Sequence, residues 1–409
     1  MLFKTDIFCE IFLFLTLIIS FFIFLYSREY LKNQSSAQKF KFYSYSSLSL
    51  LCSLLLVYSG NLIISFIAYQ LLVLSNMPLI GFFYNKQSKA ATKTYFRTLF
   101  LSGFVLILPA IIFVYYKSGG VNFIDEGILS GKITDLEASI ILALFTVGVA
   151  KNSIMPFNYW LPKMYYSAAP VSAMIHSVTG VKASLLITLK VILYIFGLDY
   201  VNKLTHQFFY GGWILYLCGI NAVYTAYLAL KTHDIKKRLI YSTVGQMSYI
   251  VSMFLVGTKM AILAGITHII THSFAKSILF LIAGAINSTY KTRKTHAIAS
   301  VASNHKIIMS CFILAGFSII GMPLLPGSIS KDLMIIADLQ SHHYEGMIFV
   351  ITGSILNIMY IYPIAKATFG KNVLQKKELP KLMSFVIISL AIIMLISLYF
   401  VTKILPRYL

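Results

Sequence analysis

Charged residues are scarce in this sequence. Only 11% of its 409 residues are Asp, Glu, Lys or Arg, 58% are apolar, and the mean hydropathy is +0.80. Because soluble domains carry about a quarter charged residues, this composition excludes a soluble globular protein and predicts a polytopic membrane protein. The net charge of +21 would suit a nucleic-acid partner. No separate soluble domain exists to bind one, so we expect no nucleic acid.

Motifs for cofactors are also missing. The four cysteines, Cys9, Cys52, Cys218 and Cys311, are isolated in or beside apolar runs, and no CxxC occurs. Neither an iron–sulfur cluster nor a disulfide framework is therefore indicated. The sequence has no GxGxxG and no Walker A pattern. We expect no cofactor, no metal and no catalytic centre in this chain, and no cleavable signal peptide at its start.

Long apolar runs are what the sequence has instead. A helix needs roughly 20 apolar residues to cross a bilayer, and about twelve runs qualify. They are 7–26, 42–58, 61–84, 93–116, 137–155, 171–197, 208–230, 239–257, 260–286, 307–338, 344–367 and 382–403. The tenth run is too long for one straight helix and contains Pro323 and Pro326, so we interpret it as broken. The sequence predicts an all-α protein embedded in a lipid bilayer.

Basic residues gather in the loops that follow the odd-numbered runs. They are Arg28, Lys32, Lys39, Lys41, Lys86, Lys89, Lys93, Lys231, Lys236, Lys237, Arg238, Lys291, Arg293, Lys294, Lys306, Lys371, Lys376, Lys377 and Lys381. The loops after the even-numbered runs have few basic residues. By the positive-inside rule, the basic loops face the cytoplasm and both termini lie outside. We expect a bacterial inner membrane, with anionic lipid headgroups against the basic loops.

Two helices are expected to be interrupted at matching places. Pro156 and Pro162 follow Lys151 at the end of the fifth run, and Pro323 and Pro326 precede Lys331 in the tenth. Proline breaks a helix, and a membrane tolerates broken backbone only inside protein or beside a wet cavity. Because the breaks lie five runs apart, they predict two repeats of opposite topology and a transport site between them. Chance prolines in a helical bundle are the alternative.

Several lysines lie at positions where the membrane makes them costly. Lys182 is about a dozen residues into its run, and burying a lysine at mid-membrane costs on the order of 2.5–3.5 kcal/mol. The simpler explanation for such residues is snorkelling, in which the ammonium reaches the interface. We favour function for Lys182 and snorkelling for Lys190, and the two explanations are balanced for Lys151. Asp332, beside Lys331, is read either as part of an ion path or as a residue of a capped helix start.

One helical face in the ninth run carries three basic side chains. His268, His272 and Lys276 are spaced four residues apart, so they share a face. Imidazole titrates near neutral pH, which suits a proton relay. A metal site is the competing reading, but no carboxylate or cysteine is nearby and lysine is a poor ligand. We therefore favour the relay.

Four sequence blocks together resemble a known family. The stretch from Lys151 to Lys182 is similar to K…PFHxWLPxAMxAPxPVSALxHxxxMVKAG, and 234–249 to DIKRxLAYSTxSQxGY. The stretch from His268 to Ala285 is similar to HxxxHAxFKxxLFLxxG, and that from Gly321 to Asp332 to GxPPxxGFxSKD. These blocks resemble the antiporter-like membrane subunits of respiratory complex I, multi-subunit cation/proton antiporters and membrane-bound hydrogenases. The order and spacing hold over roughly residues 10–370.

The resemblance implies an architecture and a set of roles. It implies two inverted five-helix repeats, each holding a half-channel: an N-terminal helix and loop at 1–41, the first repeat at 42–200, the second at 201–370, and a C-terminal helix at 371–409. Lys151 matches the pumping lysine of the first half-channel, Lys182 the linking residue, and Lys331 the terminal lysine of the second. Central and connecting groups are matched by Lys236, His268, His272 and Lys276. His176 is a feature that the sequence shares with the largest antiporter subunit and its complex I counterpart.

Departures from the family pattern bear on activity. The glutamate that partners the pumping lysine in the family falls at Gln70, which cannot pair as an ion. Asn158 replaces an imidazole. The chain starts at what resembles the third helix of the family. The sequence therefore predicts translocation of protons, with sodium as a second candidate ion, alongside other membrane subunits of a complex I-type or antiporter-type assembly. A divergent paralogue that no longer pumps is the alternative, and a stand-alone transporter is a weaker one.

Overall fold

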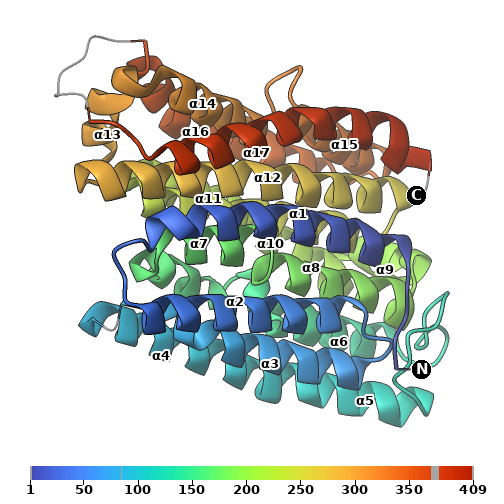
Figure 1. The fold of residues 1–409 in the computed structure, drawn as a ribbon. Helices are drawn as coiled ribbons and strands as arrows, with labels where there is room; N and C mark the ends of the chain where they lie inside the picture. The colour runs from blue at the N-terminus through green and yellow to red at the C-terminus, as the bar shows by residue number, and fades with distance from the viewer. Residues whose placement is uncertain (1, 84, 370–376, 408–409) are drawn as a thin grey trace.

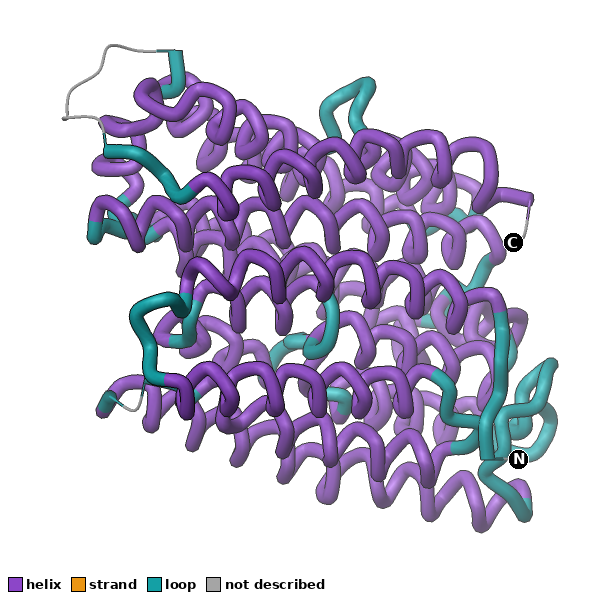
Figure 2. Tube along the Cα trace, in the orientation of Figure 1, coloured by secondary structure: helices purple, strands orange, loops and turns teal. Residues whose placement is uncertain are grey.

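The computed structural model describes residues 2–83, 85–369 and 377–407, and in these ranges the chain forms a bundle of nearly parallel helices (Figure 1). No strand is assigned in the described ranges, as the tube in Figure 2 makes clear. The main helices are α1 (Ile7–Tyr30), α2 (Ser36–Val57), α3 (Leu62–Ile80), α4 (Lys86–Ser102), α5 (Leu108–Ser118), α6 (Asp135–Gly148), α7 (Ala169–Ser177), α8 (Val181–Lys190), α9 (Leu198–Thr205), α10 (Trp213–Lys231), α11 (Ile235–Val256), α12 (Lys259–Tyr290), α13 (Thr295–Ala302), α14 (Lys306–Ile320), α15 (Pro326–Gln340), α16 (Tyr344–Ala367) and α17 (Lys381–Tyr399).

Short turns of other helix types join some of these elements. The π-helical turn η1 (Gly103–Ile107) connects α4 to α5, and η4 (Val191–Phe196) continues α8. The 3-10 helices η2 (Ala150–Asn152) and η3 (Phe157–Tyr166) follow α6. Further short turns are η5 (Phe208–Gly212), η6 (Ser303–His305), η7 (Phe400–Ile404) and η8 (Leu405–Arg407).

The predicted pattern of spans, with two of them broken, is confirmed. Eleven helices in the described ranges are long and apolar enough to cross a membrane. The difference from the predicted twelve is the fifth run, where α6 has only 14 residues before the chain leaves the α-helix. The tenth run divides into α14 and α15, and Pro326 occupies the first position of α15, where a missing N–H costs nothing.

The loops rich in basic residues lie at one end of the bundle, and the loops with few basic residues lie at the other. At the basic end, the Ile235 N–H donates to the carbonyl of Arg293 at 2.9 Å, and the Tyr290 hydroxyl donates to the carbonyl of Lys377 at 3.2 Å. Both chain ends lie at the other end (Figure 1), where Lys4 pairs with Asp125 at 2.7 Å. The membrane side that each end faces remains a prediction. The predicted loop lysines Lys371 and Lys376 lie outside the described residues.

Two helices form the centre of the bundle. In the most apolar 18-residue stretch of α12, every residue is buried inside the protein. The corresponding stretch is 94% buried in α11 but only 33% buried in the peripheral helix α16. Helix α12 packs against α1, α7, α11, α14, α15 and α17. Polar side chains on α12 therefore cannot snorkel to lipid headgroups and need partners inside the protein.

Candidate functional site

The first broken helix buries Lys151 completely. Helix α6 stops at Gly148, and Lys151 lies in η2 with 0% of its surface exposed. The break is fixed on both sides, because the indole N–H of Trp160 donates to the carbonyl of Ala150 at 2.9 Å and the Asn152 amide donates to the Thr188 hydroxyl at 2.8 Å. The Lys151 ammonium has no hydrogen-bond partner among the described residues and lies 5.1 Å from the centre of the Tyr69 ring.

Gln70 lies next to Tyr69 on α3 and is also buried without partners. Neither atom of its amide group makes a hydrogen bond with the described residues. The side chain packs against Gly103 of η1, where a Cβ would lie 2.0 Å from the Gln70 Nε2 atom. No hydrogen bond joins Gln70 to Lys151. Asn158, the other departure from the family pattern, donates its amide to Asn221 Oδ1 at 2.8 Å.

Lys182 and His272 meet at the centre of the protein. A break at Val178–Gly180 separates α7 from α8, so Lys182 lies in the first turn of α8. Its ammonium lies 2.8 Å from His272 Nδ1 and 3.8 Å from the sulfur of Met247. Lys182 is 0% exposed and His272 1%. The resemblance implied a linking residue at Lys182 and a central or connecting group at His272, and the structure brings the two into direct contact.

His268 extends this contact toward α15. Its Nδ1 lies 2.8 Å from the Ser330 hydroxyl, and its Nε2 lies 2.9 Å from Gln246 Oε1. The rings of His268 and His272 are 5.9 Å apart. Among the described residues, no group of three or more His, Cys, Asp or Glu side chains could hold a metal ion, and the relay stays a prediction. We define the central row as Lys182, His272, His268 and Ser330.

The second broken helix places Lys331 at the end of the central row. Lys331 follows Ser330 on α15, donates to the Ser354 hydroxyl and lies 5.7 Å from the centre of the Tyr249 ring. Its stem packs on Gly321. A side chain at Gly321 is disfavoured for two reasons: the φ angle is +92°, and a Cβ would lie 2.8 Å from Lys331 Cδ. Asp332 is exposed on α15, so the structure does not bring it together with the buried groups.

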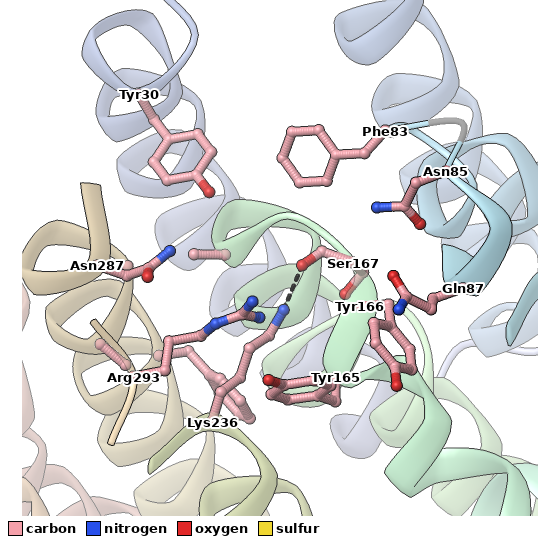
Figure 3. Close-up of a pocket in the computed structure, with 14 residues that line it drawn as sticks. Tyr30, Phe83, Asn85, Gln87, Tyr165, Tyr166, Ser167, Lys236, Asn287 and Arg293 are labelled. Carbon is pink, nitrogen blue, oxygen red and sulfur yellow. Dashed lines mark hydrogen bonds between the residues drawn. The ribbon is translucent and has the colours of Figure 1, made fainter. Parts of the chain in front are cut away.

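Three other predicted residues are buried but stand apart from the central row. The Lys276 ammonium donates to the carbonyl of Leu239 at 3.0 Å rather than to a histidine. The His176 ring stacks on Phe280 with 4.7 Å between ring centres, and neither of its nitrogens has a partner among the described residues. Lys236 donates to the carbonyl of Ser167 in a cavity at the basic end (Figure 3).

Lys190 corrects a sequence expectation. It was expected to snorkel, yet it is only 3% exposed. Its ammonium donates to the carbonyls of Val57 and Ser59, the latter at 2.9 Å. These are carbonyls at the C-terminal end of α2, where a cation is favoured by the helix dipole. Lys190 is therefore a buried structural lysine.

Sequence reasoning missed a cluster around Asp338. Asp338 is 0% exposed, and neither carboxylate oxygen has a partner among the described residues. It lies seven residues after Lys331, on the same face of α15, and this spacing is the signal that would have located it. Near it, His343 lies 3.3 Å from Glu345 and stacks on His206 at 4.5 Å. Burial lowers the pKa of His343, and the neighbouring His206 lowers it further.

Comparisons with known proteins agree on one family. A family model described as NADH:quinone oxidoreductase/Mrp antiporter, TM, matches residues 59–357. NADH-quinone oxidoreductase subunit L of Rickettsia bellii (strain RML369-C) is 30% identical over 368 residues, which are 84% of this chain and 54% of that protein. The chain thus spans about half the length of the curated relatives it matches.

Two solved structures share the fold. A chain of the membrane-bound sulfane sulfur reductase, an archaeal respiratory membrane complex, superposes with a TM-score of 0.86 at 18% identity and covers 98% of this chain and 80% of its own. A chain of the Mrp complex from Dietzia sp. DQ12-45-1b gives 0.82 at 16% identity, with 99% and 83% covered. At these identities the likeness concerns the fold alone.

Proposed function

Because the chain belongs to the family of NADH:quinone oxidoreductase and Mrp antiporter membrane subunits, we propose that it moves protons across the membrane as one subunit of a larger assembly. The observation that carries the proposal is the central row, in which Lys182 contacts His272 at 2.8 Å and His268 contacts Ser330 at 2.8 Å. The row ends beside Lys331 of the second broken helix. Sodium is a second candidate ion, because the sequence blocks also resemble subunits of multi-subunit cation/proton antiporters.

The chemistry of the row suits protons. An ammonium can donate to a neutral imidazole nitrogen, and an imidazole can accept at one nitrogen while it donates from the other. His268 faces the Ser330 hydroxyl on one side and an amide oxygen on the other. Because a hydroxyl can donate or accept, either tautomer of His268 can hydrogen-bond to Ser330. All four side chains are sealed from lipid, and a proton therefore stays within the protein. Ordered water would be needed between the two histidine rings and between Lys182 and Lys151.

A non-pumping paralogue is the second candidate. Lys151 and Gln70 are both buried without hydrogen-bond partners, so the first broken helix lacks the acid that would balance its lysine. Unpaired buried charge is costly, which favours a neutral Lys151 and an inactive first half-channel. The intact central row and Lys331 support transport through the second half.

Replacing Gln70 with glutamate is expected to raise proton transport several-fold. A carboxylate at this place gives the ammonium form of Lys151 a counter-charge inside the protein. Transport is measured with a pH-sensitive dye in proteoliposomes that hold the assembled complex. The matched control is the same substitution in a Lys151→Met background, where it should have no effect. If Q70E leaves transport unchanged, or changes it equally in both backgrounds, the proposed coupling is wrong.

Replacing Asp338 with asparagine is expected to lower transport roughly tenfold or more, because an amide cannot take up and release a proton as a carboxyl group does. The volume is kept, and removing an unpartnered buried carboxyl leaves thermal stability equal or higher. The control is Asp332→Asn, which removes the exposed carboxylate on the same helix. Equal transport in the Asp338→Asn variant and the wild type would exclude Asp338 from the path.

Purification of the tagged chain from native membranes tests the assembly. Hydrogenase-like, quinone-binding and iron–sulfur chains travelling with it would indicate a redox-driven pump. Small antiporter subunits alone would indicate a cation/proton exchanger. A chain that purifies alone and conducts no protons in liposomes would contradict the proposal. We further propose a bacterial inner membrane with both termini on the outer side, supported by the basic loops at the opposite end.

A further inference from the structure

A polar cavity opens at the basic end of the bundle. Its volume is about 420 Å³, enough for a phosphate group with several waters. Figure 3 shows Lys236 and Arg293 with their nitrogens directed into the same space, across from Tyr30 and Asn85. Gln87, Tyr165, Tyr166, Ala169 and Asn287 also line it.

The charge in this cavity is unbalanced. Lys236 is only 5% exposed, and no Asp or Glu lines the cavity. None of the ion pairs found in the described ranges includes Lys236 or Arg293. Asp234 does not line the cavity: its carboxylate accepts from the Lys237 N–H at 3.1 Å and caps α11, and it acts on Lys236 only through the electric field. Two cations that share a half-enclosed space without an acid create a strong preference for an anion.

The geometry of the donors fits a tetrahedral oxyanion. The Arg293 guanidinium lies 4.6 Å from the centre of the Tyr165 ring, which orients its fork, and its backbone carbonyl is held by the Ile235 N–H. A guanidinium fork binds phosphate through two parallel hydrogen bonds, while lysine adds a point charge. The lining amides of Asn85, Gln87 and Asn287 and the hydroxyls of Tyr30 and Tyr166 supply neutral donors.

Helix dipoles add to this preference. Asn85 is the N-cap of α4 and Gln87 lies in its first turn, Ala169 is the first residue of α7, and Lys236 lies in the first turn of α11. Three helix N-termini therefore border the cavity, and each carries a partial positive charge. Basic side chains and helix ends act in the same direction.

We propose that this cavity binds a phosphate-bearing anion between Arg293 and Lys236. The phosphate is that of a lipid headgroup or a free phosphate ester, and the two share the same recognition chemistry. The inference does not depend on proton transport, because the site is defined by binding alone.

The test measures binding to purified full-length protein in two arms. In detergent, radiolabelled inorganic phosphate is titrated by equilibrium dialysis at constant ionic strength. In nanodiscs of phosphatidylcholine with a minor share of phosphatidylglycerol, native mass spectrometry counts the retained anionic lipid. Arg293→Gln is expected to weaken binding roughly tenfold or more in at least one arm, since a bidentate charged contact is lost.

Two further variants keep the test decisive. Lys294→Gln removes an exposed cation one residue away and should leave binding within about twofold of wild type, because a screened surface charge contributes little. Gln87→Glu adds a carboxylate to the cavity at a helix start that favours acids, so it should abolish binding without unfolding α4. A change in the phosphate arm alone assigns a free anion, and a change in the lipid arm alone assigns a headgroup. If Arg293→Gln and Gln87→Glu bind like Lys294→Gln in both arms, the proposal is overturned.

Discussion

Replacing Lys182 with methionine is expected to reduce proton transport by about a hundredfold or more, as loss of a proton-transfer group does. Lys182 is the one group that His272 contacts through Nδ1, at 2.8 Å, and the other His272 nitrogen has no partner among the described residues. Methionine fills the same volume but neither holds nor donates a proton. The relay is then interrupted at Lys182, where the central row begins.

Stability separates this effect from misfolding. Burying an ammonium at mid-membrane costs free energy that methionine does not, so the melting temperature of Lys182→Met in detergent should equal or exceed that of wild type. The matched control is Lys203→Met, because the Lys203 side chain is 59% exposed and pairs with Asp135 at the surface. Wild-type transport by a folded Lys182→Met variant would mean that protons do not pass through the central row.

Replacing Gly327 with alanine is expected to destabilise the protein by more than about 3 kcal/mol, above the usual cost of overpacking, because the added atom would clash with backbone. A Cβ at this position would lie 1.7 Å from the Ser318 carbonyl oxygen. Backbone cannot rotate away as a side chain can. The Gly327 N–H also donates to the Ser318 hydroxyl at 3.1 Å, so the clash would separate α15 from α14 where they join.

The position of Lys331 depends on the same contact between Gly327 and Ser318. It lies one turn after Gly327, and displacing this turn moves Lys331 away from Ser354 and Ser330 away from His268. Gly316→Ala is the control in the same broken helix, because a Cβ there meets only side-chain atoms of Ile361, the nearest being Cγ2 at 2.9 Å. Thermal unfolding in detergent compares the two variants. If the Gly327→Ala protein unfolds at the wild-type temperature, the contact between α14 and α15 can rearrange to admit a Cβ, and the prediction is wrong.

The apolar runs predicted much of the fold. A membrane-spanning helix must make all its backbone hydrogen bonds internally, so it can be recognised in the sequence by its length and hydropathy. Proline marked the two predicted breaks, but the break at Val178–Gly180 between α7 and α8 contains no proline and was not predicted. The sequence could not specify tertiary partners. Lys276 shares the face of His268 and His272, yet it meets a carbonyl of α11, since a helical period fixes a direction and not the neighbour found there.

The missed and displaced site residues have the same explanation. Lys331 and Asp332 are adjacent in the sequence, but successive helical residues point about 100° apart, and only Lys331 is buried. Asp338 was missed because a carboxylate near the end of a run is ordinarily an interface charge, and its burial depends on how α16 packs against α15. The division into two repeats at residues 42–200 and 201–370 remains a prediction from the breaks and the resemblance.

The position of α12 inside the bundle constrains how the protein is made. This helix has no face on lipid, yet it leaves the ribosome before α14, α15 and α17, which cover one of its sides. Until α15 arrives, His268 has no Ser330 to contact. The hydrogen-bonded row is therefore finished only after most of the chain has been synthesised, so a nascent chain that stops short of residue 330 holds an incomplete relay.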